Sequence, residues 1–399
     1  MTNLTSEAIV IGGGPAGLTT AIALASAGVE TTLIARTPVA DHRTTALFAG
    51  SVTALDTLGV WAACREQAAP LKVMRIVDDT GRLFRAPEVR FDANEIGLDA
   101  FGYNIENRHL VAALAARASS LPALHRIEAD AEGIAIAEDR VTVRFAGGEA
   151  SARLVVGAEG RRSLTRVAAG IETESRSYPQ TALTLNLAHS RPHRDCSTEF
   201  HTPTGPFTLV PLPGQRSSLV YVADPVEAPR LAELSDSDLS EEIERRSHSI
   251  LGKIAVEPGR GVFPLTVETA RRFAARRAVL VGEAAHVIPP IGAQGLNLGL
   301  RDAATVAELV VTAARAGEDV SADELTGRYE HMRRADVVSR ALAVDLVNRS
   351  LLTEFLPLQG ARGIGLLMLE RIGPLRRAVM REGVSPAASQ PRLMRGEAL

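Results

Sequence analysis

The sequence predicts an α/β protein with a parallel sheet covered by helices, an inserted and mostly antiparallel β layer, and a helical C-terminal region. Residues 8–34 read as strand, glycine-rich turn, helix and strand, which is one βαβ unit. Residues 178–265 contain short β-like segments divided by Pro and Gly turns, with a charged helix near 236–249. Residues 301–381 carry a helical pattern, and the last dozen or so residues are expected to form a loose tail.

The composition is that of an ordinary globular protein, with 399 residues of which 46% are hydrophobic. Its 44 basic and 47 acidic residues give a net charge of −3, which argues against nucleic acid as a partner. Cys64 and Cys196 lack the spacing of a disulfide framework or a zinc site, so no metal is expected. We find no signal-peptide pattern and no apolar run of about 18 to 20 residues. The sequence therefore predicts a cytoplasmic protein.

The first candidate binding motif is GGGPAG at residues 12–17, between a predicted strand and a predicted helix. In the G-x-G-x-x-G pattern, Gly12 makes the tight turn, Gly14 lets a pyrophosphate approach the backbone, and Gly17 allows close helix packing. This context favours dinucleotide binding over a purely structural turn. The acid that usually holds a ribose after the second strand is missing, because Ala35 and Arg36 stand there. Arg36 is kept as a candidate cofactor contact.

A second candidate turn follows the strand near residue 152. It presents Glu159 and Gly160, with Arg161, Arg162 and Arg166 behind them. The residues alone leave two interpretations open, a ligand-binding turn or a strand end with a solvated basic turn.

The most informative stretch is AVLVGEAAHVIPPIGAQGLNLGLRDA at residues 278–303. It reads as a buried strand, a turn with Gly282, Glu283 and two prolines, and a helix that begins near Gly295 and Asn297. A carboxylate and free backbone N–H groups are thereby placed close together. So many conformationally restricted residues favour a ligand cradle, for a ligand with hydroxyl groups and an electron-rich edge.

These three turns, with DHRTTAL at 41–47, resemble the group A flavin-dependent aromatic hydroxylases over nearly the whole chain. The segments 41–61, 263–265 and 355–383 are similar to the ubiquinone-biosynthesis branch of that family. The resemblance implies a Rossmann-like FAD-binding domain of the GR2 type with an inserted, mostly antiparallel β substrate domain. We accordingly expect the FAD-binding domain at 1–177 and 266–320, the substrate domain at 178–265, and a C-terminal helical region and tail at 321–399.

The resemblance also assigns roles to residues. The first-turn glycines would face the FAD pyrophosphate, and Arg43 would lie over the cofactor. Glu159 and Glu283 stand where the family has Asp, the first touching FAD and NAD(P)H and the second touching the ribityl chain. The helix start at 295–297 would direct N–H groups at the flavin edge that gains negative charge on reduction. The candidate cofactor residues are Gly12, Gly14, Gly17, Arg36, Arg43, Asn107, Arg108, Glu159, Gly160, Gly282, Glu283, Gly295, Leu296 and Asn297, and the candidate catalytic turn residues are Pro289 and Gly292.

The implied activity is that of an FAD- and NAD(P)H-dependent monooxygenase that uses O2 to hydroxylate an aromatic ring. The substrate, in this branch a prenylated phenol, would lie between the sheet at 181–222 and the turn at 287–295, near Phe263 and Pro264. NAD(P)H would bind transiently near Arg43 and Glu159. Three alternatives stay open: a hydroxylase of a soluble aromatic compound, an FAD-dependent reductase, and a non-catalytic FAD-binding subunit of a biosynthetic complex. No general base is assigned.

Three further features have competing interpretations. His286 is interpreted as a packed histidine rather than an acid-base catalyst, although imidazole titrates near neutral pH. Trp61 is expected in the core. Segment 363–381 is amphipathic, with Arg371, Arg376, Arg377 and Arg381 opposite Leu and Met. It is a candidate contact to the inner face of a membrane or to a biosynthetic complex, and docking on the protein itself is the alternative.

Overall fold

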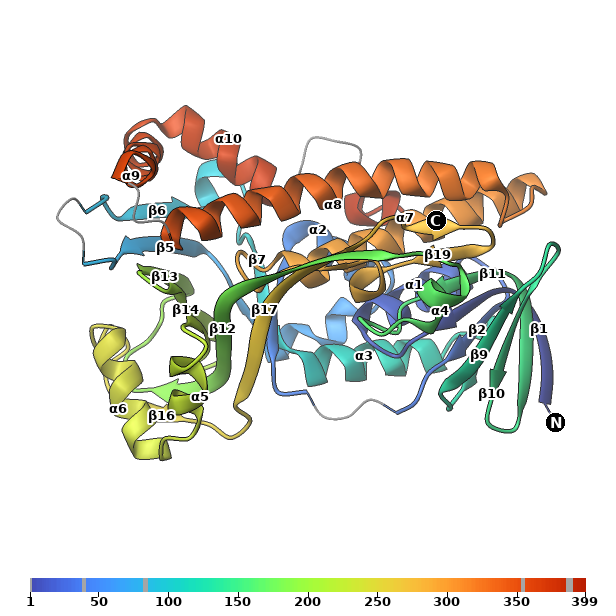
Figure 1. The fold of residues 1–399 in the computed structure, drawn as a ribbon, viewed down its shortest axis with the longest axis horizontal. Helices are drawn as coiled ribbons and strands as arrows, with labels where there is room; N and C mark the ends of the chain where they lie inside the picture. The colour runs from blue at the N-terminus through green and yellow to red at the C-terminus, as the bar shows by residue number, and fades with distance from the viewer. Residues whose placement is uncertain (1, 38–40, 82–84, 353–355, 385–389) are drawn as a thin grey trace.

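The computed structural model describes residues 2–37, 41–81, 85–352, 356–384 and 390–399. Two large sheets follow one another along the longest axis, and a long helix, α8 (Asp323–Leu352), runs beside both of them (Figure 1). The α/β class expected from the sequence is confirmed.

The first sheet contains the predicted βαβ unit. Its strands are β1 (Thr2–Ile11), β2 (Thr31–Ile34), β8 (Leu124–Ile127), β9 (Ala131–Ile136), β10 (Val141–Phe145), β11 (Gly148–Gly157), β18 (Ala274–Ala275) and β19 (Ala278–Leu280). β1 lies between β2 and β11 and is parallel to both. Ala8, Ile9 and Val10 are fully buried, as expected for a parallel strand covered on both faces. The helices of this region are α1 (Pro15–Ser26), α3 (Asn107–Ser119), α4 (Leu164–Ala168) and α7 (Gln294–Ala316).

The second sheet is mostly antiparallel, as predicted. Its strands are β5 (Val73–Asp78), β6 (Val89–Asp92), β12 (Thr173–His189), β13 (Cys196–Thr202), β14 (Gly205–Leu212), β15 (Arg216–Ala223), β16 (Ile254–Val256), β17 (Gly261–Ala270) and β20 (His286–Val287). The main strand order is β20-β17-β12-β15-β14-β13-β5-β6. One face packs an apolar cluster against α5 (Glu227–Ala232) and α6 (Asp236–Arg246).

A small third sheet lies at the junction of the two large ones. It consists of β3 (Thr44–Phe48), β4 (Ala68–Pro70) and β7 (Gly102–Glu106), and α2 (Ala49–Thr57) follows β3 directly. Short 3-10 turns occur at η1 (Trp61–Ala63), η2 (Arg65–Gln67) and η3 (Ala93–Ile96). Trp61 is 3% exposed and makes an edge contact with Tyr103, with ring centres 5.2 Å apart. The expectation that Trp61 belongs to the core is confirmed.

The C-terminal region continues with α9 (Leu356–Arg371), α10 (Gly373–Val384) and the 3-10 turn η5 (Arg392–Arg395). The expectation of a loose tail is wrong for residues 390–399. Leu393 and Met394 are 1% and 4% exposed because η5 packs against α2. Among the described residues, none of the helices combines the length and apolarity needed to cross a membrane.

Two features of the fold differ from the expected domain limits. β5 and β6 belong to the second sheet, although they precede residue 177. β12 and β17 run as antiparallel partners across the limits at 178 and 265. Strand pairing, and not order along the chain, decides which sheet a strand joins. The domain limits therefore remain a proposal.

Candidate functional site

The glycine-rich turn at 12–17 joins β1 to α1. Gly12 has φ +119°, and a Cβ there would overlap the carbonyl group of Ala158. A Cβ on Gly17 would overlap the carbonyl oxygen of Gly12. Gly14, the N-cap of α1, has no side-chain cap, and no atom of the described residues lies within 4 Å of the place where its Cβ would be. The turn is thus closed toward the protein and open at the helix start, where free N–H groups suit an anion.

The Glu159–Gly160 turn lies directly behind this loop. Glu159 Oε1 accepts a hydrogen bond from the Thr165 N–H at 2.7 Å, so the carboxylate caps α4. Glu159 Oε2 is buried and has no hydrogen-bond partner among the described residues. A Cβ on Gly160 would lie 4.0 Å from Glu283 Oε2. The structure therefore brings the two acid-glycine turns together but directs the Glu159 side chain into the protein.

Glu283 supplies an exposed carboxylate. It lies in a 3-10 turn, η4 (Gly282–Ala284), whose two other residues are buried. The backbone at Gly282 is packed so closely that a Cβ would lie 3.2 Å from the Cβ of Ala16 on α1. The pKa of Arg43 is raised, chiefly by its hydrogen bond to Asp41 and further by the charge of Glu283. Glu283 and Arg43 are therefore within electrostatic reach of each other.

Arg43 belongs to a polar cluster between the sheets. Its Nε and one terminal nitrogen donate to the Asp41 carboxylate at 2.9 and 2.8 Å, and its guanidinium lies 5.5 Å from the ring centre of Phe263. Asn107 Nδ2 donates to Asp41 at 2.9 Å, and Asn107 Oδ1 accepts from Thr45 at 2.6 Å. Both predicted residues, Arg43 and Asn107, thus occupy one cluster.

The two other predicted basic contacts are placed differently. Arg108 pairs with the buried carboxylate of Glu106 at 2.9 Å. The Arg36 backbone lies beside the first turn, since its carbonyl oxygen would be 3.4 Å from a Cβ on Gly13. Its side chain is 75% exposed and 3.9 Å from Asp130. Arg36 is therefore available to a ligand, whereas Arg108, whose side chain is 43% exposed, already shares its guanidinium with Glu106.

The start of α7 forms another wall of the site. Gly292 and Ala293 have φ of +67° and +52°, and no side chain caps the helix. Within the part of the chain that the structure describes, a Cβ on Gly292 or Gly295 would meet no atom within 4 Å. The N–H groups of the first helical turn are therefore accessible from this side. Pro289 is buried and Leu296 is half-buried.

The side chain of Asn297 locks the start of α7 to the segment from β3 to α2. Its Oδ1 accepts from the Phe48 N–H at 2.9 Å and from Ser51 Oγ at 2.8 Å. Its Nδ2 donates to the carbonyl groups of Ala46 and Ala293 at 2.8 and 2.7 Å. Because its polar atoms are all engaged, this side chain has a positioning role that the sequence did not reveal.

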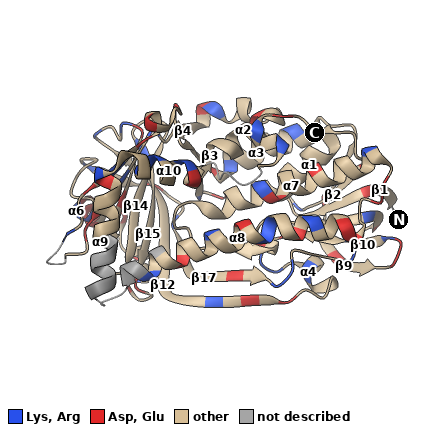
Figure 2. Cartoon of the chain, turned by 90° about the horizontal axis from the view of Figure 1, so that it is seen from above, with Lys and Arg blue, Asp and Glu red and all other residues tan. Residues whose placement is uncertain are grey.

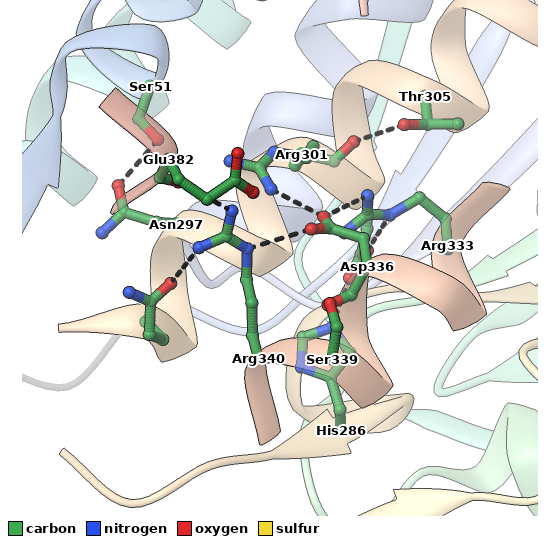
Figure 3. Close-up of polar contacts among 12 residues, drawn as sticks. Ser51, His286, Asn297, Arg301, Thr305, Arg333, Asp336, Ser339, Arg340 and Glu382 are labelled. Atoms are coloured by element: carbon green, nitrogen blue, oxygen red, sulfur yellow. Dashed lines mark hydrogen bonds and ion pairs between the residues drawn. The ribbon is translucent and has the colours of Figure 1, made fainter. Parts of the chain in front are cut away.

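A buried charge network is hydrogen-bonded to the Gly282–Glu283 turn, and Figure 3 shows its members His286, Arg301, Arg333, Asp336 and Arg340. His286 Nε2 is 2.6 Å from Asp302 Oδ2, and the two side chains are 0% and 1% exposed. Asp302 also accepts from the Gly282 N–H at 3.0 Å and from Arg333 Nε at 2.6 Å. His286 is thus a packed histidine, as expected, and Asp302 holds the turn.

The network continues along α8. Asp336 accepts hydrogen bonds from Arg301, Arg333 and Arg340 at 2.6, 2.8 and 2.9 Å. Arg340 also reaches Gln294, the first residue of α7, at 3.4 Å. Burial would raise the pKa of Asp336, but the arginine charges outweigh burial and lower it. The spacing of residues 333, 336 and 340 on one helix face was the available sequence signal for this network.

The geometry fits a dinucleotide that carries a flat, electron-rich ring. The open start of α1 suits a pyrophosphate, the exposed carboxylate of Glu283 suits hydroxyl groups, and the uncapped start of α7 suits an anionic ring edge. Fold and site together define a flavoprotein with a second sheet beside the cofactor region.

Comparison with known proteins agrees. The family model described as FAD binding domain matches residues 5–343. The chain is 36% identical to ubiquinone hydroxylase UbiL from Rhodospirillum rubrum, over 98% of this chain and 93% of that protein. It is 31% identical to 3-demethoxyubiquinol 3-hydroxylase from Escherichia coli, over 96% and 99% of the two chains. The chain belongs to the FAD-binding-domain family and is an FAD-dependent aromatic hydroxylase, a monooxygenase; NAD(P)H is the co-substrate typical of this family.

Solved structures show the same fold. The p-nitrophenol 4-monooxygenase PnpA from Pseudomonas putida superposes with a TM-score of 0.78 at 21% identity, covering 98% of this chain and all of that one. HpxO from Klebsiella pneumoniae, solved with FAD, gives a TM-score of 0.77 at 19% identity, covering 96% and 99%. The predicted family, enzyme class and cofactor are confirmed.

Proposed function

We propose that the protein hydroxylates the aromatic ring of a prenylated phenol or quinol precursor of ubiquinone. The observation that carries this proposal is the near-full-length similarity to hydroxylases named for ubiquinone or its precursors, at 36% and 31% identity. The human mitochondrial ubiquinone biosynthesis monooxygenase COQ6, 27% identical over 95% of this chain, supports the same substrate class. NAD(P)H would supply the electrons and O2 the oxygen atom.

Bound FAD supplies electron transfer and oxygen activation, which amino-acid side chains do not provide. In our assignment, the start of α1 at Gly14 binds the pyrophosphate, and Glu283 accepts hydrogen bonds from the ribityl hydroxyls. The N–H groups around Gly295 stabilise the electron-rich ring edge. The remaining proposed cofactor residues are Gly12, Gly17, Arg36, Arg43, Asn107, Arg108, Glu159, Gly160, Gly282, Leu296 and Asn297.

We place the substrate between the second sheet and the turn at 287–295. Pro289 and Gly292 would form the substrate side of that turn and exclude water from the reacting ring. NAD(P)H would bind near Arg43, whose charge suits a phosphate-bearing co-substrate.

We further propose that α9 and α10 contact the membrane surface in which a prenylated substrate dissolves. Ile364, Met368 and Val379 are 59%, 46% and 45% exposed, and the Arg371 side chain is 75% exposed. Arg376 departs from the expected basic face, since it pairs with Glu95 at 2.8 Å. Basic and acidic residues are interspersed along α8 (Figure 2), whereas α9 and α10 carry more arginine than glutamate, so apolar side chains and attraction to anionic lipid would both contribute to the contact.

The test of the substrate is to delete the gene in its host and analyse the lipids. A ubiquinone precursor that lacks one ring hydroxyl should accumulate, and the wild-type gene should restore ubiquinone. Normal ubiquinone in the deletion strain, with no second hydroxylase present, would contradict the proposal and favour a soluble aromatic substrate.

The membrane contact needs a separate test, because truncation before Gly363 would also remove the buried Leu393 and Met394. The double variant Ile364→Glu, Met368→Glu should release the protein from anionic lipid vesicles. Val226→Glu, at a position 77% exposed beside α5, is the matched control. Unchanged vesicle binding by the double variant would contradict the contact, and binding to other biosynthetic enzymes instead would indicate a complex.

A further inference from the structure

One row of side chains on the second sheet is left open. The strand register aligns Thr184, Val220, Thr208, Glu199 and Ile76 across β12, β15, β14, β13 and β5. All five are partly exposed. The opposite sheet face is filled by the apolar cluster beneath α5 and α6. We call these five residues the open row.

On one side of the open row, the neighbouring row of side chains is covered by the small third sheet. Asn186 and Ser218, which pair with each other, are 5% and 3% exposed. Thr44 Oγ1 donates to Ser218 Oγ at 2.9 Å, and Asn104 Nδ2 does so at 3.1 Å. β3 and β7 therefore close the sheet on this side.

On the other side of the open row, the neighbouring row of side chains, which includes Val222 and His201, is covered as well. Val222 and His201 are 0% and 5% exposed. Asn348 on α8 is fully buried and donates to Gln180 of β12 at 2.7 Å. The open row therefore lies between two covered rows.

Both ends of the open row reach the cofactor site. Thr184 pairs with residue 261 on β17, and Phe263 two residues further lies beneath Arg43. At the other end, Ile76 and Phe48 pack against the same buried apolar cluster, and the Phe48 N–H donates to the side chain of Asn297 at the start of α7. The open row is thus a wall of the substrate region.

Glu199 is the ionisable member of the open row. Its Oε1 lies 2.9 Å from His201 Nε2, and its Oε2 accepts from Thr208 Oγ1 at 3.2 Å. Its side chain is 22% exposed, whereas that of His201 is 6% exposed. His201 Nδ1 is buried without a hydrogen-bond partner among the residues described. Burial would raise the pKa of Glu199, but the hydrogen bonds from His201 and Thr208 and the charge of His201 outweigh it and lower the pKa.

The surroundings contain few other charges on this face. Asp78 of β5 is aligned with His201 and is 7% exposed, and its carboxylate accepts from Thr80. β14 presents Pro206, Thr208 and Val210 here, which carry no charge. Glu199 is therefore an ionised acceptor in a row whose other members, Thr184, Val220, Thr208 and Ile76, carry no charge.

We infer that Glu199 is a catalytic residue that binds the ring hydroxyl of the substrate and accepts its proton, with His201 as a positioning residue. This rests on the proposed function, because a phenol or quinol supplies that proton. Glu199 first accepts a hydrogen bond from the ring hydroxyl, and as the ring attacks and this hydroxyl becomes more acidic, the phenolic O–H bond breaks, an O–H bond to the Glu199 carboxylate forms, and the electron pair stays on the ring oxygen. The ring becomes more electron-rich, which favours attack on an electrophilic oxygen atom. Val220 and Ile76 provide apolar contact for the ring and its prenyl substituent.

The experiment compares wild type, Glu199→Gln and Glu199→Asp as FAD-loaded enzymes acting on phenols with a short prenyl chain. We expect Glu199→Gln to lower kcat by about 10²- to 10⁴-fold, the usual contribution of a general base. Its rate should recover as pH rises, and with ring-fluorinated phenols, because both changes ionise the phenol without help from the protein. Glu199→Asp should retain part of the rate. Glu174→Gln, at a position 71% exposed on β12, is the matched control.

The outcomes separate the two proposals. A wild type that hydroxylates none of these phenols refutes the proposed function. If the wild type is active and the Glu199→Gln variant has the same rate and the same pH profile, only the role of Glu199 is refuted. A loss of rate that does not respond to phenol acidity also refutes that role, because a merely structural defect behaves in this way. If Glu199→Gln fails to retain FAD, His201→Gln and Thr208→Val give the same comparison with the carboxylate in place.

Discussion

His286 and Asp302 form a buried pair, 2.6 Å apart, beneath the turn that carries Glu283. The same carboxylate oxygen accepts the backbone N–H of Gly282. The pair therefore fixes the backbone of the turn and leaves Glu283 free to face a ligand. Because Asp302 lies on α7 and its partner Arg333 on α8, the position of this turn depends on the packing of two helices.

Asp302→Ala should destabilise the folded protein by about 3–5 kcal/mol, because it leaves the charge of Arg333 buried without its closest partner. Denaturant unfolding measures the effect. Asp139→Ala, at a position 67% exposed, should leave the unfolding midpoint unchanged. Unfolding of Asp302→Ala at the wild-type midpoint would show that the network does not stabilise the fold.

Acid should unfold the protein partly through this network. Burial opposes ionisation of Asp302 and Asp336, but His286 and Arg333 lower the pKa of Asp302, and Arg333 and Arg301 lower that of Asp336. A carboxyl group with a lowered folded pKa contributes stability that is present above its unfolded pKa of about 3.9 and is lost as pH falls through the folded pKa. Asp336→Asn should thus be less stable at neutral pH and lose less Tm on acidification. Parallel Tm curves for wild type and variant would contradict this.

Gly12→Ala should weaken FAD binding at least about tenfold, because a left-handed backbone strains alanine by about 1–3 kcal/mol and the new Cβ overlaps the Ala158 carbonyl. Gly28→Ala is the matched control, since Gly28 also has positive φ, +86°, but its Cβ would meet open space. Quenching of FAD fluorescence measures both affinities. Equal losses in the two variants would mean that strain alone, and not the fit of the turn, is responsible.

Glu283→Ala should weaken FAD binding by about 10- to 100-fold, as expected for hydrogen bonds to a charged group worth about 1.5–3 kcal/mol. Glu283→Asp should weaken it less, because the carboxylate is retained. Equilibrium titration of the apoprotein with FAD provides the measurement. Wild-type affinity in Glu283→Ala would remove Glu283 from the cofactor site.

Local patterns in the sequence predicted the local structure of the site. The apolar run before GGGPAG indicated β1, and the glycine spacing indicated a turn that only glycine can adopt. The prolines and glycines at 289–295 indicated the turn before α7. These signals are readable because backbone dihedral limits and side-chain periodicity act over a few neighbouring residues.

Tertiary structure decided what each side chain does. It turned Glu159 toward α4, made Asn297 a clamp, placed β5 and β6 in the second sheet, and buried the tail at Leu393. It also set Glu199 beside His201 on an open row, although nothing near residue 199 in the sequence indicated a site. Such roles depend on partners far away in the chain, and burial with hydrogen bonding in three dimensions selects those partners after the local elements have formed.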